Sequence, residues 1–573
     1  MTPRILFCAP SSGTGKTTLT CAVLRAMQRR GFRLAACKSG PDYIDPMFHQ
    51  KVLGAKTTNL DLFFFSPETT RALLHQVGEG ADLTIIEGAM GYFDGIAMTD
   101  HASAYDLAVQ TETPAVLLLD GKGSALSLAA TLRGFTSFRS PDMLRGVILN
   151  RVKPAVAARL GKMLEEETGL QYLGCLPEVE GCGFESRHLG LVTAGEIGDL
   201  QGKLDRLADA AAESIDLDGL LALAAQAPEI SDTLALPPAP KTKVKIALAR
   251  DEAFCFYYES SLDILRALGA EIVEFSPLRD KKLPRGAAAL YLGGGYPELH
   301  GQVLAENTEM REAVRAAVLA GMPTMAECGG FLYLHRTLQE QGGHPWLMAG
   351  VLDAEGYPTG KLSRFGYVTL KAKEDSLLFA AGEEMPAHEF HYWDSTNPGS
   401  AFTAQKPLSE RGWETGVATK SLYAGFPHFH FAAKPEAAAR LWPPPGAISG
   451  RERRNAHDTF RGLRRHHPRR PGGHGAGAGE VEPGGKAPGL VGTFGGHGGA
   501  HGRNLRHGGL LHRQKGRGAL LRRQRRGGRG RHPDRPGGHG GGGRKHGAPR
   551  LQRLPHGQGG WSGGLPGGHR HGL

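Results

Sequence analysis

The stretch RILFCAPSSGTGKT at residues 4–17 decides the fold of the first part of this chain. Its first five residues, Arg4–Cys8, form a mostly apolar run with the length of a buried strand. Small residues and two glycines follow, and the pattern of residues 17–30 predicts an amphipathic helix. A strand, a glycine-rich loop and a helix in this order predict a phosphate-binding loop, although Ala9 stands where such loops usually have their first glycine.

The loop predicts a nucleotide site with a bound Mg²⁺ ion. Small residues let successive backbone N–H groups surround an oxyanion, and the N-terminus of the helix adds positive potential. Lys16 would reach the outer phosphates and the Thr17 hydroxyl would bind Mg²⁺. The alternative is an ordinary strand–helix turn with an incidental lysine. It does not account for Gly13, Gly15, Lys16 and Thr17 occurring together between a strand and a helix. The predicted nucleotide-binding residues of the loop are Ser12, Gly13, Thr14, Gly15, Lys16, Thr17 and Thr18.

Apolar strand candidates alternate with helical patterns up to about residue 225. This alternation predicts a doubly wound, largely parallel α/β sheet. Ligands gather at the carboxyl ends of such strands, so Glu87 would help Thr17 to hold the metal ion. Lys38, Asp42 and Asp45 would lie on a loop at the same edge, with Asp94 nearby. Besides Arg4–Cys8, the strand candidates are 33–38, Leu83–Glu87, 115–119 and 146–150.

A second α/β pattern begins at Val244–Ala249, after a linker at 227–243 that contains four prolines. It continues through strand candidates at 271–275, 288–292 and 324–326. We therefore expect one domain at 1–226 and a second at 244–445.

Cys328 directly follows the last of these strands and precedes a run at 331–339 that we interpret as helical. A strand–cysteine–helix elbow points the thiol out of the turn, and the helix N-terminus favours the thiolate. His428, or His430 on the same face of an extended segment, would supply the base that a nucleophilic thiol needs. Gly294, Gly295 and Gly329 would stabilise an oxyanion. A buried structural thiol is the alternative for Cys328 taken alone.

The seven cysteines show neither a disulfide framework nor a zinc pattern, and no apolar run reaches the roughly 20 residues needed to cross a bilayer. We read no secretion signal at the start of the chain and expect a cytoplasmic protein. The formal net charge is +11, but residues 451–573 contain 26 Lys and Arg against 5 Asp and Glu, which leaves −10 for the preceding 450 residues. That part gives no electrostatic reason to bind nucleic acid.

The tail at 446–573 has a different composition, with 37 glycines and 14 histidines in its last 123 residues. Such a segment has too little apolar surface to form a core, so we expect it to be disordered. It could be a nucleic-acid-binding tail, a histidine-rich metal reservoir or the out-of-frame translation of GC-rich DNA. We favour the last, because the change is abrupt and the tail has no repeat period.

Residues 1 to about 445 resemble the cobyrinate a,c-diamide synthases of cobalamin biosynthesis. The resemblance implies a phosphate-loop domain like that of dethiobiotin synthetases, followed by a class I glutamine amidotransferase domain. It also implies that ATP activates a corrinoid carboxylate as an acyl phosphate, which ammonia from glutamine then attacks, at the c and a positions in turn. The matching stretches are KSGPDYIDP (38–46), EGAMGYFDG (87–95), RHLGLV (187–192), ARDEAFCFYY (249–258), FSPL (275–278), LGGGYPELH (292–300), AECGG (326–330) and HEFHY (388–392).

The resemblance also implies roles for individual residues. Cys328 matches the glutaminase nucleophile, and His428 its base, because the family's histidine is usually the first of a His-x-His pair. Asn150 would face the adenine of ATP. No glutamate follows two residues after His428, which is expected within this family. Lys38, Asp42, Tyr43, Asp45 and Asp94 match the stretches that handle the corrinoid and the metal.

Other acceptors and one other class of protein stay open. The sequence does not distinguish cobyrinic from hydrogenobyrinic acid as the acceptor. The same machinery could also amidate nickel sirohydrochlorin, or the four other carboxylates that are amidated in cobyric acid synthesis. A deviant partition ATPase with a DNA-contacting tail is the alternative from another class, but it has no use for Cys328 or His428. The expected partners are a corrinoid acid, glutamine and ATP, with no specific nucleic acid and no membrane; a homodimer is left open.

Overall fold

The computed structural model describes residues 3–182, 194–239 and 243–442, all of which fall within one compact unit. The expectations for the tail at 446–573, for the stretch at 187–192 and for residues 240–242 of the linker concern residues outside these ranges.

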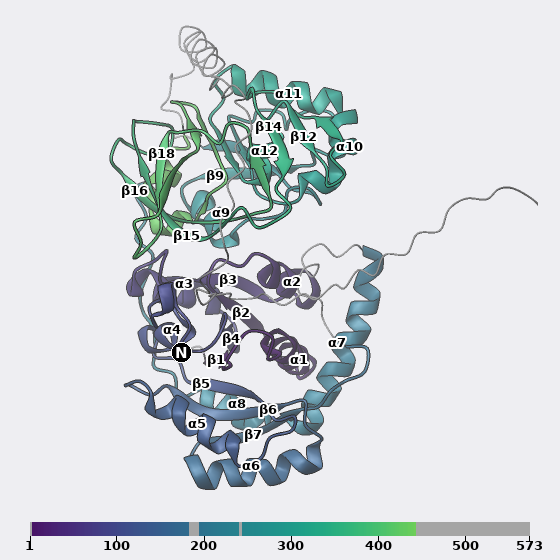
Figure 1. Cartoon of the computed structure of the whole chain (residues 1–573), viewed down its shortest axis with the longest axis vertical. Coiled ribbons are helices and arrows are strands. Elements are labelled where there is room, and N and C mark those ends of the chain that lie inside the picture. The colour runs from purple at the N-terminus through teal and green to yellow at the C-terminus, as the bar shows by residue number, and fades with distance from the viewer. Residues whose placement is uncertain (1–2, 183–193, 240–242, 443–573) are drawn as a thin grey trace, which may run out of the picture. The chain divides into compact units, whose positions relative to one another are not determined.

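A seven-stranded sheet forms the N-terminal part of the fold (Figure 1). Every neighbouring pair of its strands is parallel, as the alternation of strands and helices predicted. The strand order is β3-β2-β4-β1-β5-β6-β7. The strands are β1 (Arg4–Cys8), β2 (Leu34–Ser39), β3 (Lys56–Leu60), β4 (Leu83–Glu87), β5 (Ala115–Asp120), β6 (Leu144–Asn150) and β7 (Gln171–Leu176).

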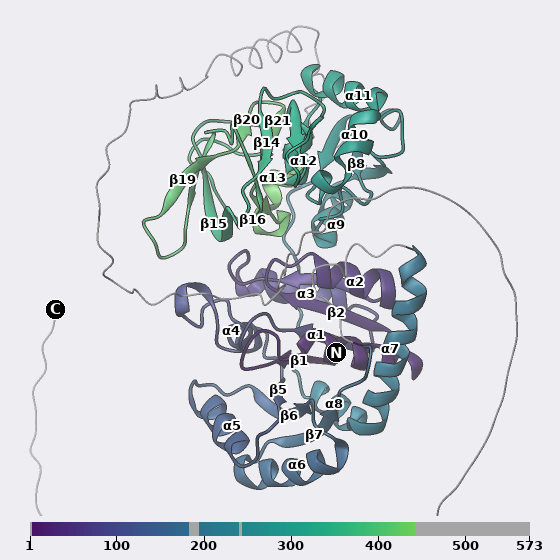
Figure 2. The same ribbon diagram turned by 45° about the vertical axis from the view of Figure 1, so that its right-hand side comes forward.

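Helices cover both faces of this sheet because successive strand residues point to opposite sides. Ile5 and Phe7 of β1 pack in the core with α1, α2, α7 and α8, whereas Leu6 and Cys8 pack with α3, α4, α5 and α6. Figures 1 and 2 show the long helix α7 running beside α1. The helices are α1 (Lys16–Arg29), α2 (Ile44–Leu53), α3 (Pro67–Gly78), α4 (Ala104–Gln110), α5 (Ser127–Ser137), α6 (Pro154–Thr168), α7 (Ala194–Ser214) and α8 (Leu217–Ala224), with a short 3-10 turn η1 (Ile96–Met98).

The C-terminal part contains a six-stranded sheet in the order β20-β21-β11-β10-β8-β9, parallel except for the edge strand β20. Its strands are β8 (Val244–Ala249), β9 (Ala270–Phe275), β10 (Ala289–Leu292), β11 (Thr324–Glu327), β20 (Val417–Ala418) and β21 (Leu422–Gly425). The helical elements are α9 (Glu259–Ala267), η3 (Pro297–His300), α10 (Gly301–Glu306), α11 (Thr308–Leu319), α12 (Gly329–Tyr333), η4 (Phe431–Ala433) and α13 (Pro435–Ala439).

Two smaller sheets complete this part, and Figure 2 shows strands of the larger one, β15, β16 and β19. The larger has five antiparallel strands in the order β19-β18-β15-β16-β22. They are β15 (Arg364–Ala372), β16 (Glu384–His391), β18 (Phe402–Gln405), β19 (Gly412–Thr415) and β22 (His428–Phe429). The smaller has the order β13-β12-β14-β17, with β12 (Thr337–Gln339), β13 (Pro345–Leu347), β14 (Glu355–Pro358) and β17 (Trp393–Ser395).

Two local expectations were wrong. The run at 331–339 is not one helix, because α12 ends at Tyr333 and residues Thr337–Gln339 pair in a sheet. The segment at 38–46 is not entirely loop, because α2 begins at Ile44 and takes up Asp45 and Pro46 in its first turn, where proline is tolerated.

The linker residues before 240 make more contacts with the N-terminal sheet and helices than their composition suggested. The guanidinium of Arg4 donates to the Pro228 carbonyl oxygen over 2.6 Å, and Arg71 forms an ion pair with Asp232 over 3.0 Å. None of the helices in the described residues combines the length and the apolarity that a bilayer crossing needs.

Candidate active sites

The phosphate loop has the backbone conformation that its glycines allow. Gly13 and Gly15 have φ angles of +76° and +102°, in the left-handed region, and Gly15 precedes the first residue of α1. A Cβ on Gly15 would come within 2.5 Å of the Asn150 side-chain nitrogen, which itself donates to the Thr14 carbonyl oxygen over 2.6 Å. The loop is therefore closed against the end of β6. Ser12 is exposed on this loop, and Thr18 is half-buried in α1.

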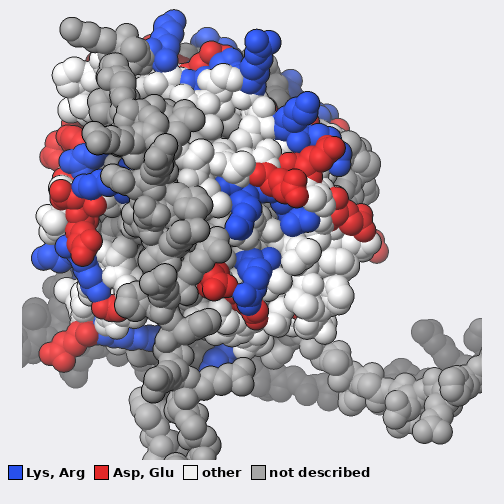
Figure 3. All heavy atoms as spheres, turned by 90° about the horizontal axis from the view of Figure 1, so that it is seen from above, with Lys and Arg blue, Asp and Glu red and all other residues white. Residues whose placement is uncertain are grey.

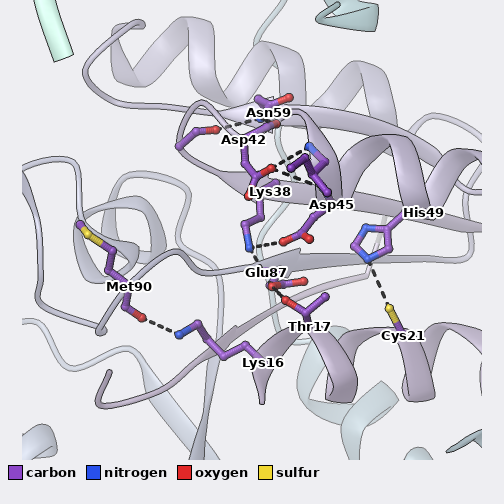
Figure 4. Close-up of polar contacts among 12 residues, drawn as sticks. Lys16, Thr17, Cys21, Lys38, Asp42, Asp45, His49, Asn59, Glu87 and Met90 are labelled. Atoms are coloured by element: carbon purple, nitrogen blue, oxygen red, sulfur yellow. Dashed lines mark hydrogen bonds and ion pairs between the residues drawn. The ribbon is translucent and has the colours of Figure 1, made fainter. Parts of the chain in front are cut away.

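Lys16 is buried beside the loop, where its ammonium donates to the Met90 carbonyl oxygen over 2.5 Å (Figure 4). It also donates to the Ser11 carbonyl oxygen over 3.1 Å. Burial, followed by the positive charge of Lys38, lowers the pKa of Lys16 to about 8. The negative charge of a bound polyanion would oppose both influences and favour the charged ammonium. The side chain is thus a cation held ready for phosphate oxygens.

A cluster of one half-buried hydroxyl, from Thr17, one buried ammonium and two buried carboxylates lies at the ends of β2 and β4 (Figure 4). The Thr17 hydroxyl donates to Glu87 Oε1 over 2.6 Å. Lys38 Nζ lies 2.7 Å from the same oxygen and 2.6 Å from Asp45 Oδ2. Burial would raise the pKa of Asp45, but the adjacent Lys38 ammonium holds it below its ordinary value. The structure thus brings together four residues, Thr17, Lys38, Asp45 and Glu87, that the sequence assigned to substrate or metal binding.

These residues fit a Mg²⁺ ion. Among the described residues, no group of three or more His, Cys, Asp or Glu side chains is arranged to hold a metal. Mg²⁺, however, usually takes one or two carboxylates and completes its shell with water and substrate phosphates. The second carboxylate oxygen of Glu87, Oε2, is buried without a hydrogen-bond partner, next to the Thr17 hydroxyl and near Asp45. Such an orphaned anionic oxygen is a suitable ligand for a hard cation.

The segment before α2 is shaped by Asp42 and by a residue that sequence reasoning missed. Asp42 Oδ1 accepts a hydrogen bond from the Ile44 amide over 2.7 Å, and burial, followed by the charge of Asp45, raises the pKa of Asp42 to about 6. The missed residue is Asn59 of β3, whose side-chain amide donates to the carbonyl oxygens of Gly40 and Asp42 over 2.8 and 2.7 Å. Asn59 was missed because its strand, KTTNL, is mostly polar and so does not stand out as a buried strand.

Tyr43 and Asp94 have different surroundings. The Tyr43 ring stacks on Tyr258 with centroids 4.4 Å apart, and its centroid lies 5.3 Å from that of His428. Asp94 is exposed, and its carboxylate accepts a hydrogen bond from the Gly91 amide over 3.0 Å. Within the described part of the chain, Asp94 makes no ion pair with Lys16 or Lys38, and the structure therefore leaves it at the margin of the cluster.

Cys328 lies at a strained elbow between β11 and α12. Its φ angle of +47° is in the region that side chains rarely adopt, and its amide donates to the Gly425 carbonyl oxygen over 2.8 Å. A Cβ on Gly330 would come within 2.2 Å of the Leu292 carbonyl oxygen, so only glycine fits there. A Cβ on Gly329 would lie 3.0 Å from the Gly295 nitrogen. The glycines predicted for an oxyanion site thus lie backbone to backbone beside the thiol.

His428, in β22, is the histidine that the structure places with Cys328. Burial alone would lower the pKa of His428, but its pairing with the Cys328 thiol and the nearby Glu327 carboxylate raises it to about 10. The ring edge lies against Gly294, since a Cβ there would come within 2.5 Å of His428 Cε1. The arrangement suits a thiolate–imidazolium pair.

His430 has other partners, so the two histidines do not share one task. Its Nδ1 accepts a hydrogen bond from the Ala432 amide over 3.0 Å, and its Nε2 lies 2.7 Å from the Ser260 hydroxyl. Burial lowers the pKa of His430 to about 3. The ring is therefore neutral, and its Nε2–H donates to Ser260. These contacts support the choice of His428 over His430 as the base.

Glu327 is the second residue that sequence reasoning missed. It is the last residue of β11, is fully buried, and its Oε2 lies 3.9 Å from His428 Nδ1. At that distance the contact is an ion pair and not a hydrogen bond. An acidic residue at the buried end of an apolar strand was the available signal.

Charged side chains elsewhere show no concentration of one sign on the face drawn in Figure 3, where the visible Lys and Arg residues are interspersed with Asp and Glu. Several form surface ion pairs, such as Arg279 with Glu252 and Arg336 with Asp353. Pairs of this kind contribute little to stability.

Known proteins resemble both halves of the chain. Residues 5–189 match the CobQ/CobB/MinD/ParA nucleotide-binding domain, and residues 245–436 match the CobB/CobQ-like glutamine amidotransferase domain. The cobyrinate a,c-diamide synthase of Listeria monocytogenes serotype 4b (strain F2365) is 38% identical over 439 residues, which cover 75% of this chain and 96% of that protein. The Salmonella typhimurium (strain LT2) protein of the same name is 39% identical over 438 residues, covering 74% and 94%.

The Priestia megaterium cobyrinate a,c-diamide synthase is 34% identical over 464 residues, covering 79% of this chain and 99% of that protein. These similarities extend over nearly the whole of each relative and include both candidate sites. The chain therefore belongs to the cobyrinate a,c-diamide synthase family, which are glutamine-hydrolysing, amide-forming ligases.

Proposed function

We propose that this chain amidates the a- and c-side-chain carboxylates of cobyrinic or hydrogenobyrinic acid, using ATP and ammonia released from glutamine. The observation that carries the proposal is the presence, on one chain, of a phosphate-loop cluster around Lys16 and Glu87 and of a Cys328–His428 pair. The names of the relatives cited above support the acceptor.

The thiol site would release ammonia. His428 takes the thiol proton, and the Cys328 thiolate attacks the side-chain amide carbon of glutamine. The oxyanion that forms would be stabilised by backbone N–H groups of Gly294, Gly295 and Gly329. The imidazolium returns its proton to the nitrogen as the C–N bond breaks and ammonia leaves. Water then hydrolyses the thioester to glutamate and restores the thiol.

The phosphate-loop site would activate the acceptor. A carboxylate oxygen of the corrinoid attacks the γ-phosphorus of ATP, the bond to the bridging oxygen of ADP breaks, and an acyl phosphate results. Ammonia then attacks the acyl carbon, and inorganic phosphate leaves. Lys16, with Gly13, Thr14 and Gly15, would stabilise the charge on the phosphoryl oxygens. Ser12 and Thr18 would line the nucleotide, and Asn150 would face the adenine.

Mg²⁺ would be held by Thr17, Glu87 and Asp45, and when bound it would neutralise charge on the phosphates. Lys38, Asp42, Tyr43 and Asp94 would contact the corrinoid acid. We assign the ATP- and corrinoid-binding domain to residues 1–226 and the glutaminase domain to residues 244–445. These boundaries are supported by the family matches at 5–189 and 245–436.

The test is an ATP- and glutamine-dependent mass change on a panel of tetrapyrrole acids. Each carboxylate converted to an amide lowers the mass of the acceptor by about 1 Da, because –OH is replaced by –NH₂. We expect two such steps on cobyrinic or hydrogenobyrinic acid. Two steps on nickel sirohydrochlorin alone would transfer the same chemistry to that acceptor, and four steps on the a,c-diamide would indicate cobyric acid synthesis. The proposal would be contradicted if the chain hydrolysed ATP but changed the mass of none of the tetrapyrrole acids.

A further inference from the structure

A histidine that acts as a base needs a partner at its second ring nitrogen. That partner fixes the tautomer and stabilises the imidazolium that forms. Here the position two residues after His428 is another histidine, His430, whose ring is bonded to Ser260 and the Ala432 amide. The sequence after His428 therefore supplies no acidic partner.

The structure brings a carboxylate to this nitrogen from another strand. Glu327 Oε2 lies 3.9 Å from His428 Nδ1, and both side chains are almost completely buried. His428 Nδ1 is itself buried without a hydrogen-bond partner. Because Nδ1 faces Glu327, the contact of His428 with Cys328 is made through Nε2. A buried polar nitrogen without a partner costs free energy unless one becomes available.

Glu327 is fixed in place by two donors. The Tyr291 hydroxyl donates to Oε2 over 2.9 Å, and the Phe429 amide donates to Oε1 over 3.2 Å. Phe429 is the residue after His428, so the same carboxylate is tied to the backbone that carries the base. Glu327 is also the residue before Cys328. One side chain thus connects the strand of the nucleophile with the strand of the base.

The other groups that face His428 cannot take this role. His388 is its antiparallel partner in β16, and burial lowers the pKa of His388 to about 3, so it is neutral. Burial raises the pKa of the Tyr43 phenol well above its ordinary value. Cys328 is the nucleophile. Within the described residues, the carboxylate that faces the ring of His428 is therefore that of Glu327.

We propose that Glu327 is the positioning residue for His428 and takes the place of the acidic residue that the sequence after His428 lacks. This inference rests on the proposed function of the thiol site. Glu327 directs the Nδ1–H of His428 toward itself and leaves Nε2 free to accept the Cys328 proton. It stabilises the imidazolium without taking the proton, which later passes from Nε2 to the departing ammonia. Such contacts are often long in free enzymes and shorten when substrate binds.

The alternative is a purely structural role, in which Glu327 only ties Tyr291 and Phe429 together. The experiment that separates the two roles is E327Q in the full chain, measured with glutamine and with free ammonia. Gln keeps the shape but loses the charge. We expect glutamine hydrolysis to fall by about 10²-fold or more, with ammonia-dependent amidation kept within about twofold. E327D, which keeps the charge on a shorter side chain, should recover part of the loss.

Alkylation of Cys328 by iodoacetamide gives a second readout that a structural role would not move. The thiolate is the reactive form. Removal of the Glu327 charge destabilises the imidazolium, so the thiolate forms only at higher pH. The midpoint of the rate against pH should rise by about one unit or more in E327Q. Labelling of Cys328→Ala supplies the background to subtract, since this variant keeps Cys255, which is half-buried and therefore more accessible than the buried cysteines.

Glu389 offers a matched control in the same part of the chain. It is a fully buried carboxylate whose Oε2 lies 3.2 Å from His391 Nε2 and whose Oε1 accepts a hydrogen bond from Trp413. E389Q makes the same chemical change at another buried Glu–His pair. It should lower both activities equally if it lowers either, and leave the alkylation midpoint where it is.

The inference is overturned if E327Q hydrolyses glutamine at the rate of the unmodified chain, or if its alkylation midpoint does not move. It is also overturned if both activities fall together in E327Q and in E327D, as they would after a loss of folding. Glutamine hydrolysis that persists in Cys328→Ala would instead contradict the proposed function of the thiol site. The two failures are therefore distinguishable.

Discussion

Lys38 Nζ lies 2.7 Å from Glu87 Oε1, and this contact places a positive charge at the end of β4 where a metal ion would also be held. Lys38→Met would leave the Glu87 and Asp45 carboxylates buried without their cation. We expect the free energy of unfolding in EDTA to fall by about 3–5 kcal/mol. Added Mg²⁺ should stabilise this variant more than the unmodified chain, as measured by urea denaturation.

Lys162→Met is the control for that measurement. Lys162 is exposed on α6 and pairs with Glu166 over 3.8 Å. Loss of this surface pair should change the free energy of unfolding by less than about 0.5 kcal/mol, with or without Mg²⁺. An equal Mg²⁺ response in Lys38→Met and in the control would remove the support for a metal at Glu87.

Cys328→Ala should abolish amidation with glutamine and keep amidation with free ammonia. Under the proposed function, the thiol only produces ammonia, and the acyl phosphate would form at the other site. Lys16→Ala should lose both activities, because it removes the charge that stabilises the outer phosphates. Both variants would be assayed by product mass after a check of folding by circular dichroism. A folded Cys328→Ala that fails with saturating ammonia would contradict this division of roles.

Asp45→Asn should reduce turnover with glutamine and with ammonia alike. Asp45 is buried and lies 2.6 Å from Lys38 Nζ, so it belongs to the cluster of the synthetase step. Asp94→Asn should have a smaller effect on turnover, because Asp94 is exposed and its carboxylate accepts a hydrogen bond from the Gly91 amide. The two variants would be compared in steady-state assays with saturating ammonia. A selective loss with glutamine in Asp45→Asn would argue against its assignment.

The pH dependence of stability should report the protonation of His428. Its pKa in the folded chain is about 10, above its ordinary value of 6.5. A raised folded-state pKa means that the protonated ring contributes stability that is fully present below about pH 6.5 and is lost as the pH rises through about 10. The difference in unfolding free energy between the unmodified chain and His428→Gln should therefore shrink over this window.

NMR of histidine-labelled protein offers a direct measurement. The pKa of His428 should fall when Cys328 is replaced by Ala, because the thiol is one of the groups that raises it. A His428 that titrates near 6.5 in the unmodified chain would contradict the proposed thiolate–imidazolium pair.

A chain that ends at Gly450 should keep full amidation activity and the same melting temperature. The glutamine amidotransferase match ends at residue 436, and the described core ends with the buried residues Leu441 and Trp442. A chain that ends at His430 is the matched control, because it lacks the buried Phe431 and α13 and should unfold. Loss of amidation in the longer of the two truncated chains would contradict the prediction.

The sequence predicted the apolar strands well and the polar or very short strands poorly. The bounds of β1, β4 and β8 agree with the predicted runs, because these strands are buried on both faces and are continuously apolar. β3 was missed because its residues, KTTNL, are mostly polar. The short strand β12 was interpreted as helix, since three residues show no reliable period.

The residues of the candidate sites likewise fall into a group that the sequence reveals and a group that it does not. Lys16, Thr17, Lys38, Glu87 and Cys328 were recognisable because each belongs to a local motif at the end of a strand. Asn59 and Glu327 were not, because their importance depends on contacts with residues distant in the sequence. The pairing of β11 with β21, which sets Glu327 opposite Gly425, and the hydrogen bond from the Phe429 amide to Glu327 bring Glu327 to His428. No spacing in the sequence encodes that contact.

The pairing of β11 with β21 has a consequence for the order of events on the ribosome. Cys328 follows β11, whereas β21, whose Gly425 carbonyl oxygen accepts from the Cys328 amide, and His428 come much later in the chain. A nascent chain that has emerged from the ribosome as far as Cys328 still lacks the base, His428, and the strand β21 that pairs with β11. The ATP-binding domain, which precedes both, can fold while the glutaminase is incomplete. Under the proposed division of roles, the residues of the ammonia-consuming site are therefore all synthesised before the ammonia-releasing site is complete.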